Sequence, residues 1–544
     1  MKKISIQIKN GEIYNLQLEG LQKTEVNGLI YITINKSKDL IKNDDIIEFC
    51  KKNNGITISK NSNKIEIYND PFRTIPLFIT KSNSNEILIF SDFADFKKLN
   101  IPVTTDTTGF WEIALFGFAL ATRTAFNEVK QMTSASKIII STNNKYKITP
   151  YWNFEIYKKK DNLSPNEAVK QLDNHLTTIF SKNLIRNKKY IMGLSGGLDS
   201  RLSSAYISKY LNKNSVRFFT FGYDKKTLEY TLSKKVANTL NFNKPDFYLL
   251  TKKKYLASLN SFSDITAGLI SFQHAHIYSY LKNTSKTILD FTFISNYYSD
   301  AIFGFCTKLT KDTELKNSWY YNTIQNKKNL LTESVYEKIF NDIELIFKRF
   351  ETKSNFSTFD EFIYIVEKNP KFHNYLSFLY SNFTEILSPY TNFTLLNYMI
   401  SLPFAFRKEK GILDELLKKY FPNLSFEDNS SRLATDSSFR LWMKQGPIEY
   451  LKYLFLKINV LFILVGLKFQ LKSKYLTEDH RALFHKYLRP KYRGALNFMS
   501  QKKIITTQQL KHFSRLTIRH YEYSIRLNLI NLANVIKKFN TFQK

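Results

Sequence analysis

Cysteine is nearly absent from this chain. Cys50 and Cys306 are the only two thiols among 544 residues, so neither a disulfide framework nor a cysteine zinc cluster can form. So little cysteine fits a reducing compartment. The length suffices for two or three domains, and 43% apolar residues supply sizeable cores, which excludes global disorder.

Long hydrophobic runs are absent as well. The most apolar segment, residues 458–467, lies between two lysines and is far shorter than the roughly 20 residues that cross a membrane. We expect it to form a buried or interfacial helix. The opening residues, MKKISIQIKNGEIYNL, have two lysines but no apolar stretch behind them, which is not the pattern of a secretory signal. We therefore expect a cytoplasmic protein.

Acidic side chains are few relative to basic ones. Lysine and arginine total 80 against 47 aspartate and glutamate, a formal charge of +33, and residues 441–544 hold 20 against 4. This balance favours anionic partners: nucleic acid, phospholipid headgroups or acidic substrates. A solvated basic face explains it equally well, and contact with the inner face of an acidic membrane is the next alternative. The cations concerned include Lys502, Lys503, Arg515, Arg519, Arg526, Lys537 and Lys538.

The first part of the chain is rich in β-branched runs. They lie at residues 4–8, 29–34, 55–59, 64–68, 86–90 and 137–142, with polar and glycine-containing turns between them. Short strands at this spacing, without long helical patterns, predict a layered, β-rich domain over residues 1–155.

A polar linker around residues 158–165 ends in a helix start. Ser164 fits the N-cap, Pro165 the first helical position and Glu167 the third. From about residue 186 strands alternate with helices: strands at 190–194, 216–221, 247–250 and 287–294, and helices at 200–211 and 228–240. This pattern predicts a doubly wound parallel sheet, with ligands at the carboxyl ends of its strands. Beyond about residue 330 the chain is predicted to be mostly helical.

The stretch YIMGLSGGLDSRLSSAY, residues 190–206, falls at the first strand-to-helix junction of that sheet. Gly196 and Gly197 let the backbone approach an anion, and Ser195 and Ser200 add hydroxyl donors at a helix N-terminus. Asp199 would repel a bare phosphate, so it implies a bridging cation, most simply Mg²⁺. Neither the Walker A pattern nor GxGxxG is present.

The pattern SGGxDS after a strand resembles the pyrophosphate loop of ATP pyrophosphatases, which split ATP between its α and β phosphates. Further motifs resemble the asparagine synthetase family in particular: Thr220-Phe221-Gly222 ending the next strand, ISNYYSDAIFGF at 294–305, SPY at 388–390 and LLNYMISLP at 395–403. The resemblance implies ATP and Mg²⁺ as cofactors and an ATP-binding set of Leu194, Ser195, Gly196, Gly197, Asp199, Ser200, Thr220, Phe221 and Gly222.

The N-terminal region resembles the same family. DPFRTIPLF at 70–78 is similar to its "DrxGxxPLYY", and Tyr151-Trp152 to the "YW" that ends its glutaminase domain. The resemblance implies an Ntn-hydrolase-like fold for residues 1–155, an ATP pyrophosphatase domain over 160–428 and a basic, mostly helical extension over 429–544. Position 2, where glutaminases of the family have a nucleophilic cysteine, is Lys2, so we expect no glutaminase activity in this chain.

The segment after the fourth strand departs from the family too. Asp300 stands where the second Mg²⁺ carboxylate is implied, beside Asp199, but Ala301 replaces the following glutamate, and Tyr297 and Tyr298 replace an acidic residue and a glycine. A general base is therefore missing or comes from elsewhere. The family's segment with a catalytic lysine is replaced by NSSRL at 429–433. Besides Asp199, the catalytic candidates are Lys410 and Arg432, as cations that neutralise the departing pyrophosphate.

Histidines at 274 and 276 are not predicted to bind a metal. On a helix, positions i and i+2 point to different sides, and no cysteine or acidic cluster accompanies them. We expect ordinary polar or core histidines.

The favoured hypothesis is an ATP-dependent, AMP-forming carbon–nitrogen ligase that activates a carboxylate and passes it to ammonia or an amine. The acid is expected to be aspartate, an acidic sugar of a glycan, or a peptide carboxylate. One alternative is a catalytically reduced, ATP-binding scaffold protein. The other, ranked last, is a tRNA-modifying ATP pyrophosphatase, because a glutaminase-like domain precedes the loop; nucleic acid is thus the less favoured partner.

Overall fold

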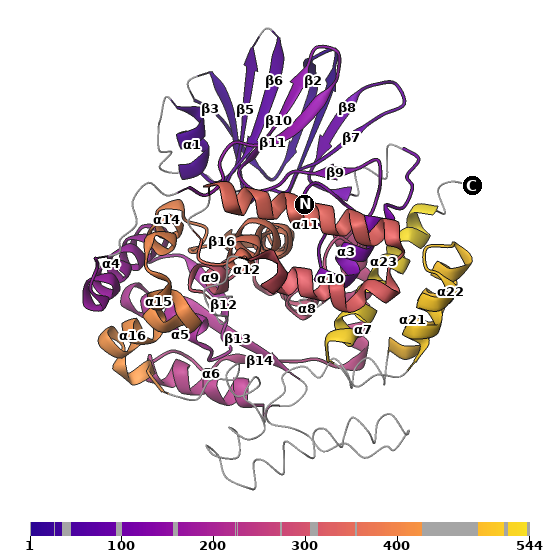
Figure 1. Cartoon of the computed structure of the whole chain (residues 1–544). Helices are drawn as coiled ribbons and strands as arrows, with labels where there is room; N and C mark the ends of the chain where they lie inside the picture. Colours follow the sequence, from indigo (N-terminus) through magenta and orange to yellow (C-terminus); the bar gives the residue numbers. More distant parts are fainter. Residues whose placement is uncertain are drawn as a thin grey trace.

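The computed structural model shows a β-rich layer above a parallel-sheet domain, with the C-terminal helices along one side (Figure 1). It describes residues 2–26, 28–34, 45–61, 63–93, 101–155, 162–222, 225, 227–272, 275–304, 314–353, 356–426, 488–515 and 520–540.

Two antiparallel sheets form the N-terminal domain. In spatial order the first contains β2 (Glu12–Glu19), β1 (Lys3–Lys9), β8 (Ile87–Phe90), β7 (Phe78–Lys81) and β9 (Lys130–Gln131). The second contains β11 (Tyr146–Pro150), β10 (Ser136–Ser141), β6 (Lys64–Asn69), β5 (Ile56–Asn61), β4 (Leu29–Thr33) and β3 (Gln22–Val26). Alternate residues such as Ile4, Ile6 and Ile8 are fully buried in one core shared by both sheets. The predicted layered β-rich fold is confirmed.

Two helices in this domain were not predicted. They are α1 (Ile46–Lys52), capped by Asp45, and α3 (Thr107–Phe116), capped by Asp106. Every residue of α3 after Thr107 is buried, so the helix has no polar face. A helix that is apolar all round lacks the amphipathic period by which a sequence reveals it.

The linker ends as the sequence predicts. Ser164 caps α4 (Pro165–Asn183) through a reciprocal pair of hydrogen bonds with Glu167, and Pro165 is the first helical residue. A favourable local start therefore fixes where α4 begins.

The second domain is built on a parallel sheet in the order β14 (Asp246–Leu249), β13 (Val216–Gly222), β12 (Lys189–Gly193), β15 (Phe291–Ile294) and β16 (Glu385–Leu387). All four pairs of neighbours are parallel. The chain moves outward from β12 to β14 and then returns to the other side of β12 at β15. This reversal is a topological switch point, where a doubly wound sheet opens a crevice at the carboxyl ends of two strands.

The connecting helices are α5 (Leu198–Tyr210), α6 (Leu228–Thr239), α7 (Lys252–Thr266) and α8 (Ala275–Thr284). The predicted doubly wound α/β fold is confirmed, with two corrections. The strand predicted at 287–294 begins only at Phe291, because Ser285–Thr287 form a 3-10 turn. The short edge strand β16 lies in a region predicted to be helical, where three residues give no period to detect.

Helices predominate among the described residues after β15, which agrees with the helical region predicted beyond about residue 330. They are α9 (Ser299–Ile302), α10 (Trp319–Lys327), α11 (Glu333–Lys353), α12 (Phe359–Ile363), the π-helix η5 (Tyr364–His373), α13 (Asn374–Tyr380), α14 (Phe393–Ser401), α15 (Phe404–Arg407) and α16 (Gly411–Tyr420). Single 3-10 turns lie at η3 (Leu315–Asn317), η4 (Lys328–Leu330), η6 (Lys408–Lys410) and η7 (Pro422–Leu424).

The C-terminal helices α21 (Arg489–Gln501), α22 (Thr507–Ser514) and α23 (His520–Asn540) lie against both domains (Figure 1). From α23, Asn528 donates to the carbonyls of Ile113 and Ala114 in α3, each at 3.1 Å, and Asn531 donates to Ile270 at 2.8 Å. Arg526 is buried and donates to the carbonyl of Arg515 at 2.6 Å. This arginine is part of the core rather than of a basic surface.

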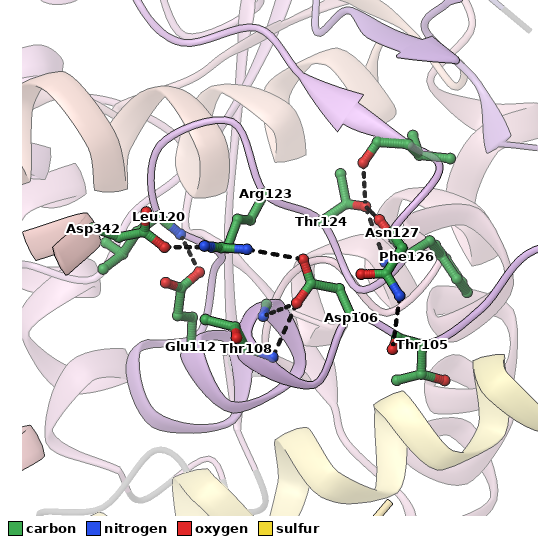
Figure 2. A network of polar contacts seen from close by, with 12 residues as sticks. Thr105, Asp106, Thr108, Glu112, Leu120, Arg123, Thr124, Phe126, Asn127 and Asp342 are labelled. Carbon is green, nitrogen blue, oxygen red and sulfur yellow. Dashed lines mark hydrogen bonds and ion pairs between the residues drawn. The ribbon is translucent and has the colours of Figure 1, made fainter. Parts of the chain in front are cut away.

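A partly buried ion network joins the two domains (Figure 2). Arg123 bonds Asp106, at the start of α3, at 3.2 Å, and also pairs with Asp342 on α11. Beside it, Glu112 accepts from the backbone N–H of Leu120 at 2.9 Å. Within the part of the chain that the structure describes, no helix is long and apolar enough to cross a membrane, and residues 458–467 lie outside that part.

Candidate functional site at the switch point of the parallel sheet

The glycine-rich turn after β12 has a backbone that only glycine accepts at one position. Gly196 has φ +75°, and a Cβ there would lie 2.4 Å from the Cβ of Leu232. Gly197 then caps α5 without a side-chain hydrogen bond to the first turn of the helix. The turn thus places a helix N-terminus, with its partial positive charge, at the carboxyl edge of the sheet.

Side chains hold this turn from within. The hydroxyls of Ser195 and Ser200 lie 3.2 Å apart, and Ser200 donates to the carbonyl of Gly197 at 3.0 Å. Arg201, almost fully buried, donates through Nε to the carbonyl of Gly196 at 2.6 Å and through Nη1 to Phe426 at 2.8 Å. No local pattern points to Arg201, because its role depends on the carbonyl of Phe426, which is 225 residues away.

The predicted ATP-binding residues of β13 lie beside this turn. Thr220 donates to the carbonyl of Leu194 at 2.7 Å, and Leu194 N–H donates to Phe219 at 2.9 Å, so the two strand ends are tied together. Phe221 packs on His276, with ring centroids 3.9 Å apart. His276 is buried, which confirms the expectation of a core histidine there, while position 274 lies outside the described residues. Gly222 ends the strand.

The loop after β15 forms the other side of the crevice. Asn296 accepts from Ser203 of α5 at 2.8 Å, and Ser295 shares a hydrogen bond with Ser377 at 2.9 Å. Tyr298 has φ +79° and donates to the carbonyl of Ile365 at 2.9 Å. A glycine would adopt this left-handed backbone freely. Here Tyr298 adopts it, and contacts of its ring and its hydroxyl hold the residue in place. Asp300 follows in the first turn of α9.

Asp199 and Asp300 meet at a single cation. The ammonium of Lys410 contacts a carboxylate oxygen of each, although the three residues come from widely separated segments. Lys410 and Glu409 have φ of +63° and +52°, two successive left-handed residues directly before α16. Such strain persists where the surrounding contacts fix the backbone, and it clusters at functional sites.

Burial and charge split the pKa values of the two carboxyl groups. Desolvation raises the pKa of Asp199 to about 6, outweighing the attraction of Lys410, and the neighbouring Asp300 raises it further. Burial acts the same way on Asp300, but Lys410 reverses it and lowers the pKa of Asp300 below its ordinary value. The two carboxylates raise the pKa of Lys410, so its ammonium stays charged. Two neighbouring acids whose pKa values are shifted in opposite directions around one fixed cation are typical of a functional site.

The acidic pair fits a divalent cation with oxygen ligands. Oδ1 of Asp199 is buried and accepts no hydrogen bond in the structure, and both carboxylates lie within reach of one charge. In the described part of the chain no group of three or more His, Cys, Asp or Glu side chains gathers as a metal site. Two carboxylates with further ligands from phosphates and water match the way Mg²⁺ is bound with nucleotides.

Other predicted residues lie elsewhere. Arg432 lies outside the described residues, so its predicted role stays a prediction. Lys2 donates from its backbone N–H to Asn382 at 2.7 Å and from its ammonium to Ile34 at 3.2 Å. Cys50 is a buried thiol whose pKa desolvation raises to about 12, which keeps it protonated. A thiolate is the nucleophilic form, so Cys50 does not replace the missing cysteine.

Fold and site together define a doubly wound α/β domain with a glycine turn at a helix N-terminus and a carboxylate pair at its switch point. No protein-family model and no curated protein sequence matches the chain. One solved structure that matches is the NH3-dependent NAD synthetase from Campylobacter jejuni subsp. jejuni NCTC 11168 in complex with the nitrate ion. It is 14% identical, covers 35% of this chain and 86% of its own, and has a TM-score of 0.19, so function has to be argued from the site itself.

Proposed function

We propose that this chain is an ATP-dependent, AMP-forming carbon–nitrogen ligase. It adenylates a carboxylate and transfers the acyl group to ammonia or an amine. The observation that carries this proposal is the convergence of Asp199 and Asp300 on Lys410, beside the N-terminus of α5. A turn at a helix N-terminus alone would suit any phosphate, whereas a carboxylate pair beside it favours a polyphosphate that is bound with a cation.

In the first half-reaction, one group of residues binds the polyphosphate and another would bind Mg²⁺. The carboxylate oxygen of the acid attacks the α-phosphorus, and the bond to the oxygen of the β-phosphate breaks, with the electron pair leaving on pyrophosphate. The backbone N–H groups of the turn at Gly196 and Gly197 and the hydroxyls of Ser195 and Ser200 hold the polyphosphate. Mg²⁺, held by Asp199 and Asp300, would supply charge neutralisation on the phosphates when bound.

Lys410 is placed to act on the leaving group. Its ammonium is fixed by the backbone turn before α16, and that turn follows Arg407, which pairs with Glu361 and donates to Ser357 at 3.1 Å. A fixed cation beside the carboxylate pair stabilises negative charge that grows on departing pyrophosphate. Arg432 is proposed for the same role from the sequence alone.

The acceptor acid and the amine are proposed by class. Aspartate, an acidic sugar and a peptide carboxylate are the candidate acids, and free ammonia or an amine is the proposed donor, because Lys2 stands where glutaminases have their cysteine. Anchoring of an anionic substrate or an acidic membrane surface by the basic C-terminal region stays a prediction. Of the cations named for it, Arg526 is excluded by its burial.

The test is the nucleotide product formed with each class of acid. Purified protein with ATP, Mg²⁺, ammonium and one candidate acid is expected to release AMP and pyrophosphate in equal amounts, and only with the correct acid. Release of ADP and phosphate would contradict the proposal. ATP binding without AMP release in the presence of every acid class would support a scaffold protein instead, and RNA retained through purification would support the tRNA-modifying alternative.

A further inference from the structure

The side chain of Arg201 connects two segments that are far apart in the sequence. It is 1% exposed, and its Nε donates to the carbonyl of Gly196 at 2.6 Å. Its Nη1 donates to the carbonyls of Phe426 at 2.8 Å and of Leu424 at 3.5 Å. The guanidinium carbon lies 3.7 Å from the ring centroid of Phe426, and the ammonium of Lys235, on α6, lies 4.0 Å from the same centroid. One buried arginine therefore holds the chain around Phe426 against the glycine turn.

The hydrogen bond from Arg201 determines which way the peptide between Gly196 and Gly197 faces. In a trans peptide the C=O and the N–H point in opposite directions. Because Arg201 binds the carbonyl of Gly196, the N–H of Gly197 faces the other side, where it donates to Oγ of Ser195 at 3.2 Å. Oγ of Ser200 lies 3.2 Å from that hydroxyl. The turn thus presents donors, and not a carbonyl oxygen, at the N-terminus of α5.

Glycines on both sides of this peptide make its orientation easy to change. With no Cβ at Gly196 or Gly197, the peptide between them can turn over at little steric cost. The opposite orientation would direct a carbonyl oxygen at a bound phosphate and repel it, because that oxygen is the negative end of the peptide dipole. A donor that holds the Gly196 carbonyl therefore selects the orientation in which the turn attracts anions.

We propose that Arg201 is the positioning residue of the polyphosphate turn, and that it makes nucleotide affinity depend on the docking of residues 422–426. This inference rests on the proposed function and deepens it. The carbonyls and the ring of the docked segment hold the guanidinium, and the guanidinium holds the peptide of Gly196. Coupling between two sites is reciprocal, so a polyphosphate bound at the turn also stabilises the docked segment.

Titration with ATP and with inorganic pyrophosphate, each in the presence of Mg²⁺, tests the positioning role. Arg201→Met is expected to weaken both by about 10- to 100-fold, the range for a lost hydrogen bond from a charged donor. Arg201→Lys keeps the charge but not the fork that binds two carbonyls, so its affinities should lie between those of the wild type and Arg201→Met.

Arg526→Met is the matched control for these substitutions. It removes another buried arginine that donates to a backbone carbonyl at 2.6 Å, in the C-terminal helices. It should bind ATP and pyrophosphate as the wild type does, although it is expected to lower the free energy of unfolding. Wild-type affinities in Arg201→Met, or equal losses of affinity in Arg201→Met and Arg526→Met, would overturn the proposal.

The coupling to the docked segment is tested through Phe426. Phe426→Leu removes the ring but leaves the backbone carbonyl, and it should weaken ATP binding by about 2- to 10-fold. In the Arg201→Met background the same change should have little further effect, because both act through one contact. Additive effects of the two substitutions on ATP binding would contradict the coupling.

Hydrogen exchange measures the coupling from the other side. The N–H of Leu424 donates to Phe421 at 2.8 Å, and that of Ser425 donates to Pro422 at 3.0 Å, so exchange of these amides reports local opening of the segment. ATP should slow their exchange in the wild type and leave it unchanged in Arg201→Met. Exchange that ATP does not slow in the wild type would contradict the coupling.

Failure of this inference and failure of the proposed function give different results. Pyrophosphate binding that depends on Arg201, in a chain that releases no AMP with any class of acid, would support the inference and contradict the ligase proposal. AMP release with a productive acid, together with unchanged ATP affinity in Arg201→Met, would overturn the inference alone.

Discussion

Gly196 is the residue of the site that tolerates substitution least. Its φ of +75° and the 2.4 Å approach to Leu232 leave no room for a side chain. Gly196→Ala is therefore expected to lower the free energy of unfolding by about 1–3 kcal/mol and to abolish ATP binding. Denaturant unfolding and nucleotide titration measure the two effects.

Gly494→Ala is the control for that substitution. Gly494 lies inside α21, and a Cβ there would meet nothing within 4 Å, so alanine should stabilise the helix by about 0.5–1 kcal/mol. Similar effects from the two substitutions would show that the Gly196 turn is not constrained as the structure indicates.

Ionisation of Asp199 is expected to lower stability and to raise activity as the pH increases. Its pKa is raised to about 6 in the folded chain against 3.8 in the unfolded one, so folding favours the protonated carboxyl. The contribution to stability is full below about pH 4 and is lost as the pH rises through about 6. Asp199→Asn should therefore raise the midpoint of thermal unfolding at pH 7.5 by a few degrees. Activity needs the carboxylate, so exchange in the wild type should fall as the pH is lowered through 6.

Residue-level prediction from sequence was possible where the chemistry is local. Ser195, Gly196, Gly197, Asp199 and Ser200 form one turn, and their spacing alone indicates an anion site. Arg201 was missed because its partner, the carbonyl of Phe426, is distant in sequence. Lys410 was named only through a resemblance, since two left-handed residues are not visible in a sequence.

At the scale of elements, the π-helix η5 and the turn at 119–121 hold the two domains together. Glu367 accepts from the backbone N–H of Ala121 at 3.0 Å and pairs with Lys371, which also donates to the carbonyl of Ala119 at 3.1 Å. Both side chains are almost fully buried. Buried pairs of this kind are costly to break, because the remaining charge has no water around it.

Lys371→Met tests how much it costs to break the buried pair of Glu367 and Lys371. It leaves the carboxylate of Glu367 buried without its cation and is expected to lower the free energy of unfolding by about 3–5 kcal/mol, measured by denaturant titration. Adding Glu367→Gln, which keeps an acceptor for Ala121, should recover most of the loss. Lys348→Met, at an exposed pair 3.6 Å from Glu344, should change stability by no more than about 0.5 kcal/mol. A loss at Lys371 no larger than at Lys348 would refute this account of the junction.

Element prediction failed in physically understandable places. The helix α3 is buried all round, the strand β16 has three residues, and β15 begins only after a 3-10 turn. Longer elements with a clear period, such as α5, α6 and β13, were placed within two residues of their ends. The order of the strands in the parallel sheet, and with it the switch point, is a tertiary property that no local pattern specifies.

At the scale of the whole molecule, α23 connects the two domains. Its Asn528 binds carbonyls of α3 in the first domain, and its Asn531 binds Ile270 in the second. The chain is therefore expected to unfold in a single calorimetric transition. Asn528→Leu removes the side-chain donor to the carbonyls of Ile113 and Ala114, of which Ile113 still accepts from the N–H of Gly117. It should lower the midpoint of that one transition, at a cost of about 0.5–1.5 kcal/mol. Two separate transitions in the wild type would contradict this coupling.

The central claim is that Asp199 of α5 and Asp300 of α9 jointly hold the cation that is needed when ATP is split between its α and β phosphates. The most direct measurement is acid-dependent ATP–pyrophosphate exchange in the wild type, in Asp199→Asn and in Asp300→Asn. Asp173→Asn is the control. It changes a carboxylate of α4 that is bound to Tyr206 and Lys209 of α5. Each site variant is predicted to lose at least about 10²-fold, and the control to retain its activity. Exchange that survives in both site variants would contradict the account.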